Sequence, residues 1–126
     1  MKTITNILFL CGIIALTAFS CEKENEEEAP YACGVENPLE NIVWLKNLVT
    51  DLTADTEIDS ATITSYNYLE SNAFYVYIHK KMQYNMPSPI FNCEGVIIFK
   101  VGGNQLNDSS AIFFNHATNP ILIWPK

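Results

Sequence analysis

Apolar residues recur at helical spacing in the stretch that follows Asn37. Residues suited to a core appear every three or four positions, at Ile42, Leu45, Leu48, Val49 and Leu52. That period places their side chains on one face of an α-helix. Asn37 can cap such a helix, Pro38 suits its first turn, and Glu40 stands where a capping box needs it. The pattern predicts one amphipathic helix over residues 38–53, followed by a polar loop up to residue 59.

From Ala61 onward the period changes to that of β-strands. Residues rich in β-branched and aromatic side chains predict strands over residues 61–69 and 74–83, with a turn at Ser71 and Asn72. A two-residue turn at that place pairs Tyr68 with Tyr75, Tyr66 with Tyr77, and Thr64 with His79. The four tyrosines then form a patch on one face of the sheet, opposite to the face that carries Phe74, Val76 and Ile78.

The rest of the chain predicts two more strands. Residues 95–101 are apolar on both faces, which favours an inner strand ending at the turn Gly102–Asn104, and residues 121–124 are typical of a last strand. Pro87 and Pro89 predict a loop over residues 85–92, and residues 108–119 fit either a short helix or a bulged strand. The predicted fold class is α+β, with one amino-terminal amphipathic helix packed on an antiparallel sheet of about four strands.

The amino end has the pattern of a targeting segment. Lys2 precedes an apolar run over residues 7–18, which is shorter than the roughly 20 residues of a membrane-spanning helix. The segment that ends at Cys21, Leu16-Thr17-Ala18-Phe19-Ser20-Cys21, resembles the lipobox of bacterial lipoproteins, whose cysteine is acylated. An ordinary secretory signal cut near Ser20 is the alternative. We therefore divide the chain into a signal peptide (1–20), a lipidated cysteine with its tether (21–29) and one domain (30–126).

The tether carries five glutamates and a lysine within residues 22–28, with no apolar side chain to bury. Such a run is typical of a solvated linker. It also looks like the export signal that sends Bacteroidota lipoproteins to the cell surface. We expect a protein anchored to the outer membrane through lipid on Cys21 and displayed outside, with a periplasmic face as the alternative.

Cysteine and charge counts narrow the chemistry of the domain. Cys11 is lost with the signal and Cys21 is acylated, so Cys33 and Cys93 remain and, in an oxidising compartment, are expected to form a disulfide. A metal pair or a catalytic thiol is less consistent with their neighbours, which include no histidine or third cysteine at ligand spacing. Residues 29–126 hold nine acidic residues against five lysines and no arginine, which argues against nucleic-acid binding.

No constellation in the sequence carries an evident reaction. His79 and His116 are the only histidines, and neither stands at a spacing that suggests a nucleophile, base or metal set. Asp55, Glu57 and Asp59 alternate in one loop, but the loop lacks the glycine and the terminal glutamate of an EF-hand. We predict no enzyme activity and no cofactor or metal.

Two patterns remain as candidate sites. The patch formed by Tyr66, Tyr68, Tyr75 and Tyr77 offers aromatic rings with polar tips, which suit a glycan or a protein partner. The alternatives are a half-exposed sheet face without a partner, or a core face on which the helix packs. The tripeptide Asp59–Ala61 is similar to the site at which Bacteroidota proteins are O-glycosylated, which makes Ser60 a candidate for modification.

Several short motifs together resemble a family of small Bacteroidota lipoproteins of uncharacterised function. The motifs are Cys33–Glu40, Trp44–Lys46, Asn92–Gly95, Gly102–Gly103 and Leu122–Trp124. Family members tend to have a proline where this chain has Val43, and further cysteines that are absent here. The resemblance implies the cellular address and the fold and supplies no catalytic residues. We expect a non-enzymatic binding module for a protein or glycan, with a periplasm-facing inhibitor or chaperone-like accessory protein as the alternative.

Overall fold

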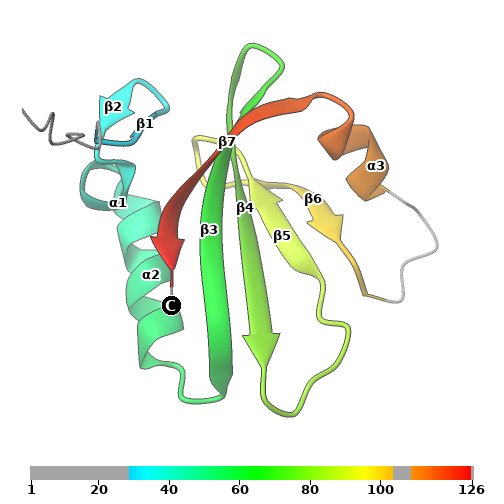
Figure 1. Cartoon of the computed structure of the whole chain (residues 1–126). Helices are drawn as coiled ribbons and strands as arrows, with labels where there is room; N and C mark the ends of the chain where they lie inside the picture. The colour runs from blue at the N-terminus through cyan, green and yellow to red at the C-terminus, as the bar shows by residue number, and fades with distance from the viewer. Residues whose placement is uncertain (1–28, 104–108, 126) are drawn as a thin grey trace, which may run out of the picture.

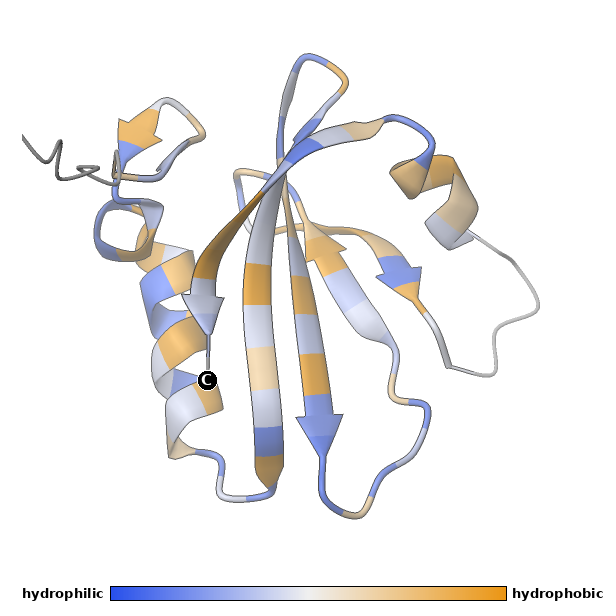
Figure 2. Ribbon diagram, in the orientation of Figure 1, coloured by the Kyte–Doolittle hydropathy of each residue, from blue (hydrophilic) through white to orange (hydrophobic). Residues whose placement is uncertain are grey.

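A five-stranded antiparallel sheet is the centre of the molecule (Figure 1). The computed structural model describes residues 29–103 and 109–125. The strand order is β6-β5-β4-β3-β7. In chain order the strands are β3 (Ile58–Tyr68), β4 (Ser71–Lys80), β5 (Ser88–Phe91), β6 (Ile97–Val101) and β7 (Ala117–Pro125). The longest strands, β3 and β4, form the middle of the sheet, and Figure 2 shows apolar positions alternating along both.

The remaining elements lie around this sheet. A two-stranded ribbon, β1 (Tyr31–Ala32) with β2 (Val35–Glu36), precedes two consecutive helices, α1 (Pro38–Asn41) and α2 (Val43–Ala54). A third helix, α3 (Ser109–Phe114), precedes β7. Figure 1 shows α2 on one side of the sheet and α3 on the other side, near the upper end. None of the helices in the described ranges is long and apolar enough to cross a membrane.

The predicted fold class is wrong. The described residues are mostly β, with seven strands in two sheets, and the helices among them are short. They do not form one amino-terminal helix on a sheet of four strands. The prediction failed because it missed the ribbon β1–β2 and took residues 88–91, which form the inner strand β5, for a loop. It also placed residues 97–101 inside the sheet, whereas β6 is an edge strand.

The predicted helix over residues 38–53 is broken at Ile42. This residue is extended, with φ −101° and ψ 107°, and it separates α1 from α2. Asn37 does not cap the helix with its side chain, because its backbone is left-handed at φ 48°. Leu45 and Leu52 of α2 are buried as the helical spacing predicts, and they pack in one core with Ile63, Phe74 and Val76 of the sheet.

The hairpin β3–β4 turns two residues earlier than predicted. Tyr66 pairs with Ala73 and Tyr68 with Ser71, so the turn residues are Leu69 and Glu70. Leu69 takes the left-handed conformation at φ 53°, which apolar side chains rarely adopt, so residue preferences pointed to Ser71 and Asn72 instead. The partner of Tyr66 moves by four positions, from Tyr77 to Ala73. Because four is even, every side chain keeps its predicted face.

Candidate ligand-binding site

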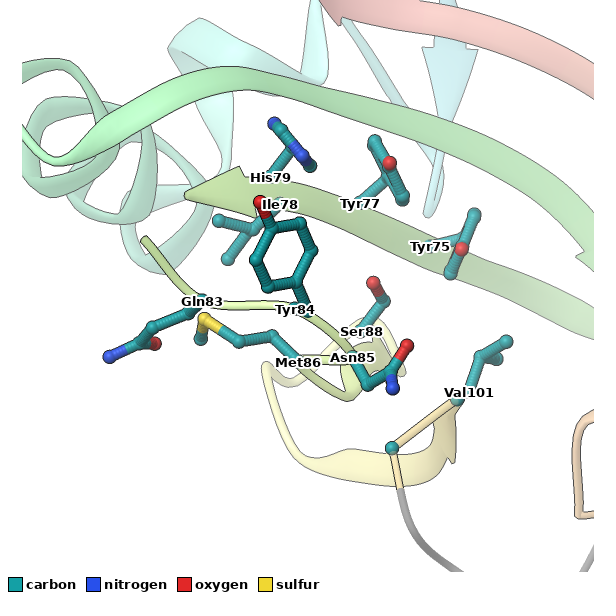
Figure 3. A pocket seen from close by; sticks show the side chains of 12 residues that line it. Tyr75, Tyr77, Ile78, His79, Gln83, Tyr84, Asn85, Met86, Ser88 and Val101 are labelled. Atoms are coloured by element: carbon teal, nitrogen blue, oxygen red, sulfur yellow. The ribbon is translucent and has the colours of Figure 1, made fainter. Parts of the chain in front are cut away.

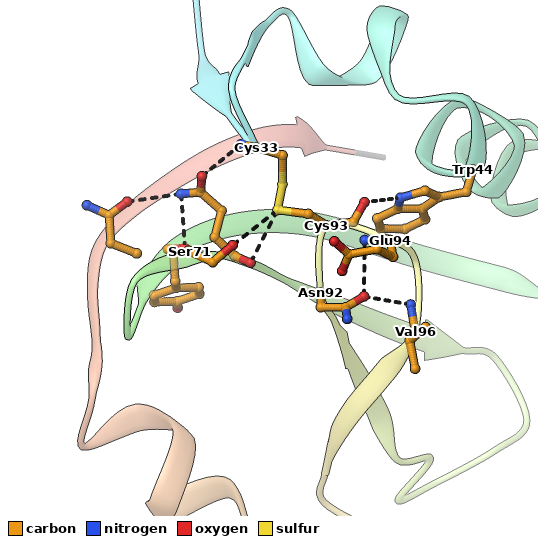
Figure 4. Close-up of a disulfide and its surroundings, with 10 residues drawn as sticks. Cys33, Trp44, Ser71, Asn92, Cys93, Glu94 and Val96 are labelled. Carbon is orange, nitrogen blue, oxygen red and sulfur yellow. Dashed lines mark hydrogen bonds between the residues drawn. A yellow bond between two sulfur atoms is a disulfide. The ribbon is translucent and has the colours of Figure 1, made fainter.

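The disulfide predicted between Cys33 and Cys93 is confirmed, with the two Cα atoms 5.7 Å apart (Figure 4). It ties the ribbon β1–β2 to the turn between β5 and β6. The backbone N–H of Cys33 also donates to Oδ1 of Asn72 at 2.7 Å, which fixes the ribbon against the start of β4. Asn72 therefore serves as a tertiary acceptor rather than as the predicted turn residue. The loop closed by the disulfide spans 60 residues, so the bond restrains much of the unfolded chain.

The motif Asn92–Gly95 forms the turn that carries Cys93. Oδ1 of Asn92 accepts from the backbone N–H groups of Glu94 and Val96, at 3.1 and 2.9 Å. The indole Nε1 of Trp44 donates to the carbonyl of Cys93 at 2.8 Å (Figure 4). The indole lies directly on Gly95, where an added Cβ would come within 2.8 Å of the ring. These motif residues therefore have a structural role, and they hold α2 and the disulfide together.

The four predicted tyrosines do share one face of the sheet, but α3 covers part of that face. Phe113 of α3 is completely buried, with ring centroids 5.5 Å from Tyr66 and 4.9 Å from Tyr68. Phe114 lies 5.7 Å from Tyr75. Burial, and secondarily the neighbouring Tyr75, raise the pKa of Tyr66 above its ordinary value of 10.0. The helix that packs on the tyrosines is thus α3 and not the amino-terminal helix, and a second core lies here.

Beyond α3 the same face opens into a gap between β4 and β5. In the described part of the chain these strands pair only through Phe74 with Phe91 and Tyr75 with Ile90. Past that point β4 continues to Lys80, and β5 pairs with β6 alone, where Pro89 lies opposite Lys100. Proline has no N–H to donate, so Pro89 cannot continue the ladder towards β4. Figure 1 shows the two strands diverging towards the lower end of the sheet.

A cavity of 360 Å³ occupies this gap. Figure 3 shows Tyr75, Tyr77 and His79 in a row on β4, with Tyr84 rising towards them from the loop between β4 and β5. The other labelled side chains of the wall are Ile78, Gln83, Asn85, Met86, Ser88 and Val101. Tyr77 is 42% exposed and Tyr84 is 88% exposed, so both rings are accessible from solvent. We call this cavity the tyrosine pocket.

The rim of the tyrosine pocket is formed by the loop between β4 and β5 and by the Gly102–Gly103 turn, and local contacts restrict the conformation of both. At one end of the loop a bridge joins Lys80 to Gln83, and at the other end Pro87 precedes β5. The Gly102–Gly103 turn lies close to the loop, because a Cβ on Gly103 would be 3.5 Å from Pro87. Both glycines have φ near +80°, at 79° and 78°, which other residues rarely adopt. The chain bends at both glycines, where a turn over Gly102–Asn104 is predicted, while Asn104 itself lies outside the described residues. The bend borders the rim of the pocket.

The histidines and acidic residues singled out in the sequence make separate pairs and do not form one cluster. Nδ1 of His79 is 3.5 Å from Asp59, whereas Nδ1 of His116 is 2.9 Å from the carbonyl of Ile112. Nζ of Lys80 is 2.9 Å from Asp55 and 3.6 Å from Glu57. The hydrogen bond with Asp55 is the main cause that raises the pKa of Lys80. In the ranges that the structure describes, no group of three or more His, Cys, Asp or Glu is placed to hold a metal ion.

Of the two predicted modification sites, Ser60 and Cys21, only Ser60 lies within the described residues. Ser60 lies in β3, opposite His79, next to a bulge, and is partly buried. Its glycosylation stays a prediction that intact-mass measurement tests. Cys21, the predicted lipidation site, lies outside the described residues.

Sequence reasoning found Tyr75 and Tyr77 as parts of a binding face but missed most of the other residues that line the tyrosine pocket. Gln83, Tyr84 and Asn85 fall in a segment that was predicted as the end of a strand and the start of a loop. A signal for this site was present in Pro87 and Pro89, because two prolines next to a strand limit its pairing. That the resulting gap encloses a cavity depends on the course of the loop, which residue preferences do not specify.

Comparison with known proteins adds no relative. No family model matches the chain, and no curated protein or solved structure is significantly similar to it. The function is therefore inferred from the geometry of the tyrosine pocket and from the sequence.

Proposed function

We propose that this chain is a non-enzymatic binding protein, anchored to the outer membrane through lipid on Cys21 and displayed at the cell surface. The observation that carries the proposal is the tyrosine pocket, an open cavity whose walls combine aromatic rings, amides, a serine hydroxyl, an imidazole and apolar side chains. Its volume, 360 Å³, falls within the range of about 300 to 1,000 Å³ that small-ligand sites occupy.

The position of the pocket suits a protein tethered at its amino end. The described domain begins at residue 29, next to β1, and Figure 1 shows β1 at the upper end of the molecule. The loop between β4 and β5, which forms the rim of the tyrosine pocket, lies at the lower end. An anchor upstream of β1 therefore attaches at the end opposite to the pocket. This arrangement supports binding of a ligand that arrives from outside the cell.

The chemistry of the pocket favours binding over acyl transfer. The walls include Ser88 and His79, and His79 lies beside Asp59, so the three residue types of a hydrolytic triad are present. A triad needs its nucleophile within hydrogen-bond distance of the base. In the described residues no hydrogen bond joins Ser88 to His79. Ser88 is the first residue of β5 and lies in the part of that strand that does not pair with β4.

Two experiments on cells test the surface display and the lipid anchor, and a binding assay tests the pocket. Protease treatment of intact cells should remove the domain, and replacing Cys21 by alanine should abolish incorporation of labelled palmitate. A domain that is protected until the outer membrane is permeabilised would contradict surface display and favour the periplasm-facing inhibitor or accessory role.

The binding assay concerns the pocket. An array that carries both oligosaccharides and short peptides is probed with the full chain, with the Tyr77→Ser/Tyr84→Ser double variant and with Tyr31→Ser. Tyr31 is 59% exposed and lies in β1, outside the pocket, so it is a matched control. Every specific signal should disappear in the double variant and persist in Tyr31→Ser. Signals that survive in the double variant would rule out the pocket as the binding site.

A further inference from the structure

We infer that the ligand of the tyrosine pocket is a neutral saccharide, with one sugar ring held against Tyr77 and Tyr84. This inference rests on the proposed function and names its ligand class. It depends on three properties of the pocket, namely the charge of its walls, the mixture of apolar and polar surface, and the constrained rim.

The described walls of the pocket carry no permanent charge. Among the 12 lining residues in the described part of the chain there is no lysine, arginine, aspartate or glutamate. The nearest lysine in sequence, Lys80, does not line the pocket and is paired with Asp55 and Glu57 instead. A phosphate, sulfate or carboxylate group would be desolvated here without a cation to compensate. The pocket therefore selects against anionic ligands.

The walls combine flat apolar surface with hydrogen-bonding tips. Tyrosine rings offer faces against which the C–H groups of a sugar ring can pack, and their hydroxyls reach solvent or ligand. Gln83 and Asn85 add amides, each of which both donates and accepts. A ligand that is uncharged, ring-shaped and covered with hydroxyl groups matches this mixture.

Ser88 adds a hydroxyl to the walls. The residue is 4% exposed, and no hydrogen bond of its hydroxyl is found in the described part of the chain. No polar side-chain atom there is both fully buried and without a partner, so the hydroxyl retains access to the pocket that it lines. Water or a ligand in the pocket can therefore satisfy this hydroxyl. A sugar hydroxyl can both donate to it and accept from it.

A peptide fits the pocket less well. An added strand would need a long free edge for its main-chain hydrogen bonds. The free edge of β4 in the gap runs only over residues 76–79, between the last pair with β5 and the bridge at Lys80. The loop and the Gly102–Gly103 turn close off the rim, so a short compact ligand is accommodated better than an extended chain.

The test is a titration of the full chain, purified in a detergent without a sugar headgroup, followed by NMR and calorimetry. The neutral probes are maltose, cellobiose, lactose and di-N-acetylchitobiose. The acidic probes are sialyllactose and a sulfated heparin disaccharide, and a valine–threonine tetrapeptide represents strand addition. We expect at least one neutral probe to shift the signals of residues 75–79, 83–88 and 101–103. The acidic probes should bind at least about tenfold more weakly.

Variants assign the contacts. Tyr84→Ser and Tyr77→Ser should each lower the affinity about tenfold, and Ser88→Ala by a few-fold, whereas Tyr31→Ser should leave it unchanged. The high exposure of Tyr84 makes its substitution harmless to the fold, which an unchanged melting temperature verifies. Tyr84→Phe should keep most of the affinity, because the ring face is retained.

Each alternative result has a definite meaning. Absence of binding by every neutral probe, or acidic probes that bind as tightly as neutral ones, overturns the inference. Binding of the tetrapeptide alone, lost in the Tyr77 and Tyr84 variants, overturns the saccharide as ligand while the proposed binding function stands. Saccharide binding that the tyrosine variants leave unchanged contradicts both the site and the inference.

Discussion

One face of the sheet carries Tyr66, Tyr68, Tyr75 and Tyr77, and we call it the tyrosine face. Both halves of this face are built on β3 and β4 and carry tyrosines, yet α3 covers one half, the closed half, and the other half is open to the tyrosine pocket. In the closed half, Tyr66 and Tyr68 pack under α3 against Phe113. In the open half, Tyr77 faces the tyrosine pocket, with Tyr84 as its counterpart from the loop. Tyrosine can serve both halves because its ring buries like an apolar side chain and its hydroxyl tolerates water.

The difference follows from what covers each half. The six residues of α3 extend over the end of the face where β4 still pairs with β5. Where that pairing stops, none of the described strands lies in the gap, and the face lines the tyrosine pocket. Because α3 is short and the pairing of β4 with β5 stops early, only one half of the tyrosine face becomes core, and the other half remains a candidate binding site.

Removing the disulfide should have the largest effect on the stability of the fold and little effect on the open half. The Cys33→Ala/Cys93→Ala variant should lose about 4 kcal/mol of unfolding free energy, because the 60-residue loop is no longer closed. Urea denaturation of the full chain measures the loss. The NMR signals of residues 83–88 should change little, because the bond joins the β1–β2 ribbon to the turn between β5 and β6. Figure 1 shows both at the upper end of the molecule, away from the loop between β4 and β5. Collapse of those signals would show that the halves are not independent.

Truncating Phe113 should open the closed half. Phe113→Ala removes a fully buried ring and should cost about 3 to 4 kcal/mol, also measured by urea denaturation. Phe114, which is 40% exposed, is the matched control on the same helix, and Phe114→Ala should cost about 1 to 2 kcal/mol. Equal costs for the two variants would mean that α3 does not close a core.

A comparison of two glycine variants separates the cost of a steric clash with Trp44 from the cost of backbone strain. Gly95→Ala should cost about 3 kcal/mol, because its φ is 78° and its Cβ would meet the indole at 2.8 Å. Gly34 has nearly the same φ, 77°, but nothing lies within 4 Å of an added Cβ. Gly34→Ala should therefore cost only about 1 to 2 kcal/mol of strain. If calorimetric melting gives equal shifts, the indole does not pack as described.

The smallest expected effect is a loss of stability at alkaline pH that comes from Tyr66 in the closed half. Tyr66 has a raised pKa in the folded protein, so its contribution to stability is complete below pH 10 and is lost as the pH rises through the folded pKa. Ultraviolet absorbance of tyrosinate during a pH titration should lose its most alkaline part in the Tyr66→Phe variant. An unchanged titration curve in that variant would argue that Tyr66 is not shielded by α3.

The sequence predicted the sidedness of the hairpin better than its register. Period-two alternation assigned Tyr66 and Tyr77 to one face and Phe74 to the other, and this holds because faces depend only on parity. The turn position was wrong, since Leu69 adopts a backbone conformation that residue preferences disfavour. In the observed register Asn72 lies in β4 and accepts from the backbone of Cys33, 39 residues away, a contact that local residue preferences do not contain.

The tyrosine pocket was harder to predict than the disulfide. Counting cysteines after removal of Cys11 and Cys21 left one possible pair, and Cys33–Cys93 is that pair. The pocket depends on where β5 stops pairing with β4 and on where the loop places Tyr84. Neither property is encoded by local periodicity. Pro89 marks the interruption but was interpreted as a loop signal, although it lies within β5.

Tyrosine nitration followed by mass spectrometry tests the contrast between the two halves most directly. In the folded full chain, tetranitromethane should modify Tyr84, Tyr77 and the control Tyr31 rapidly, and Tyr66 and Tyr68 slowly. Adding the neutral disaccharide that binds best should protect Tyr77 and Tyr84 and leave Tyr31 reactive. Rapid nitration of Tyr66 and Tyr68 in the folded chain, or no protection of Tyr77 and Tyr84 by a saturating neutral disaccharide, would contradict the account.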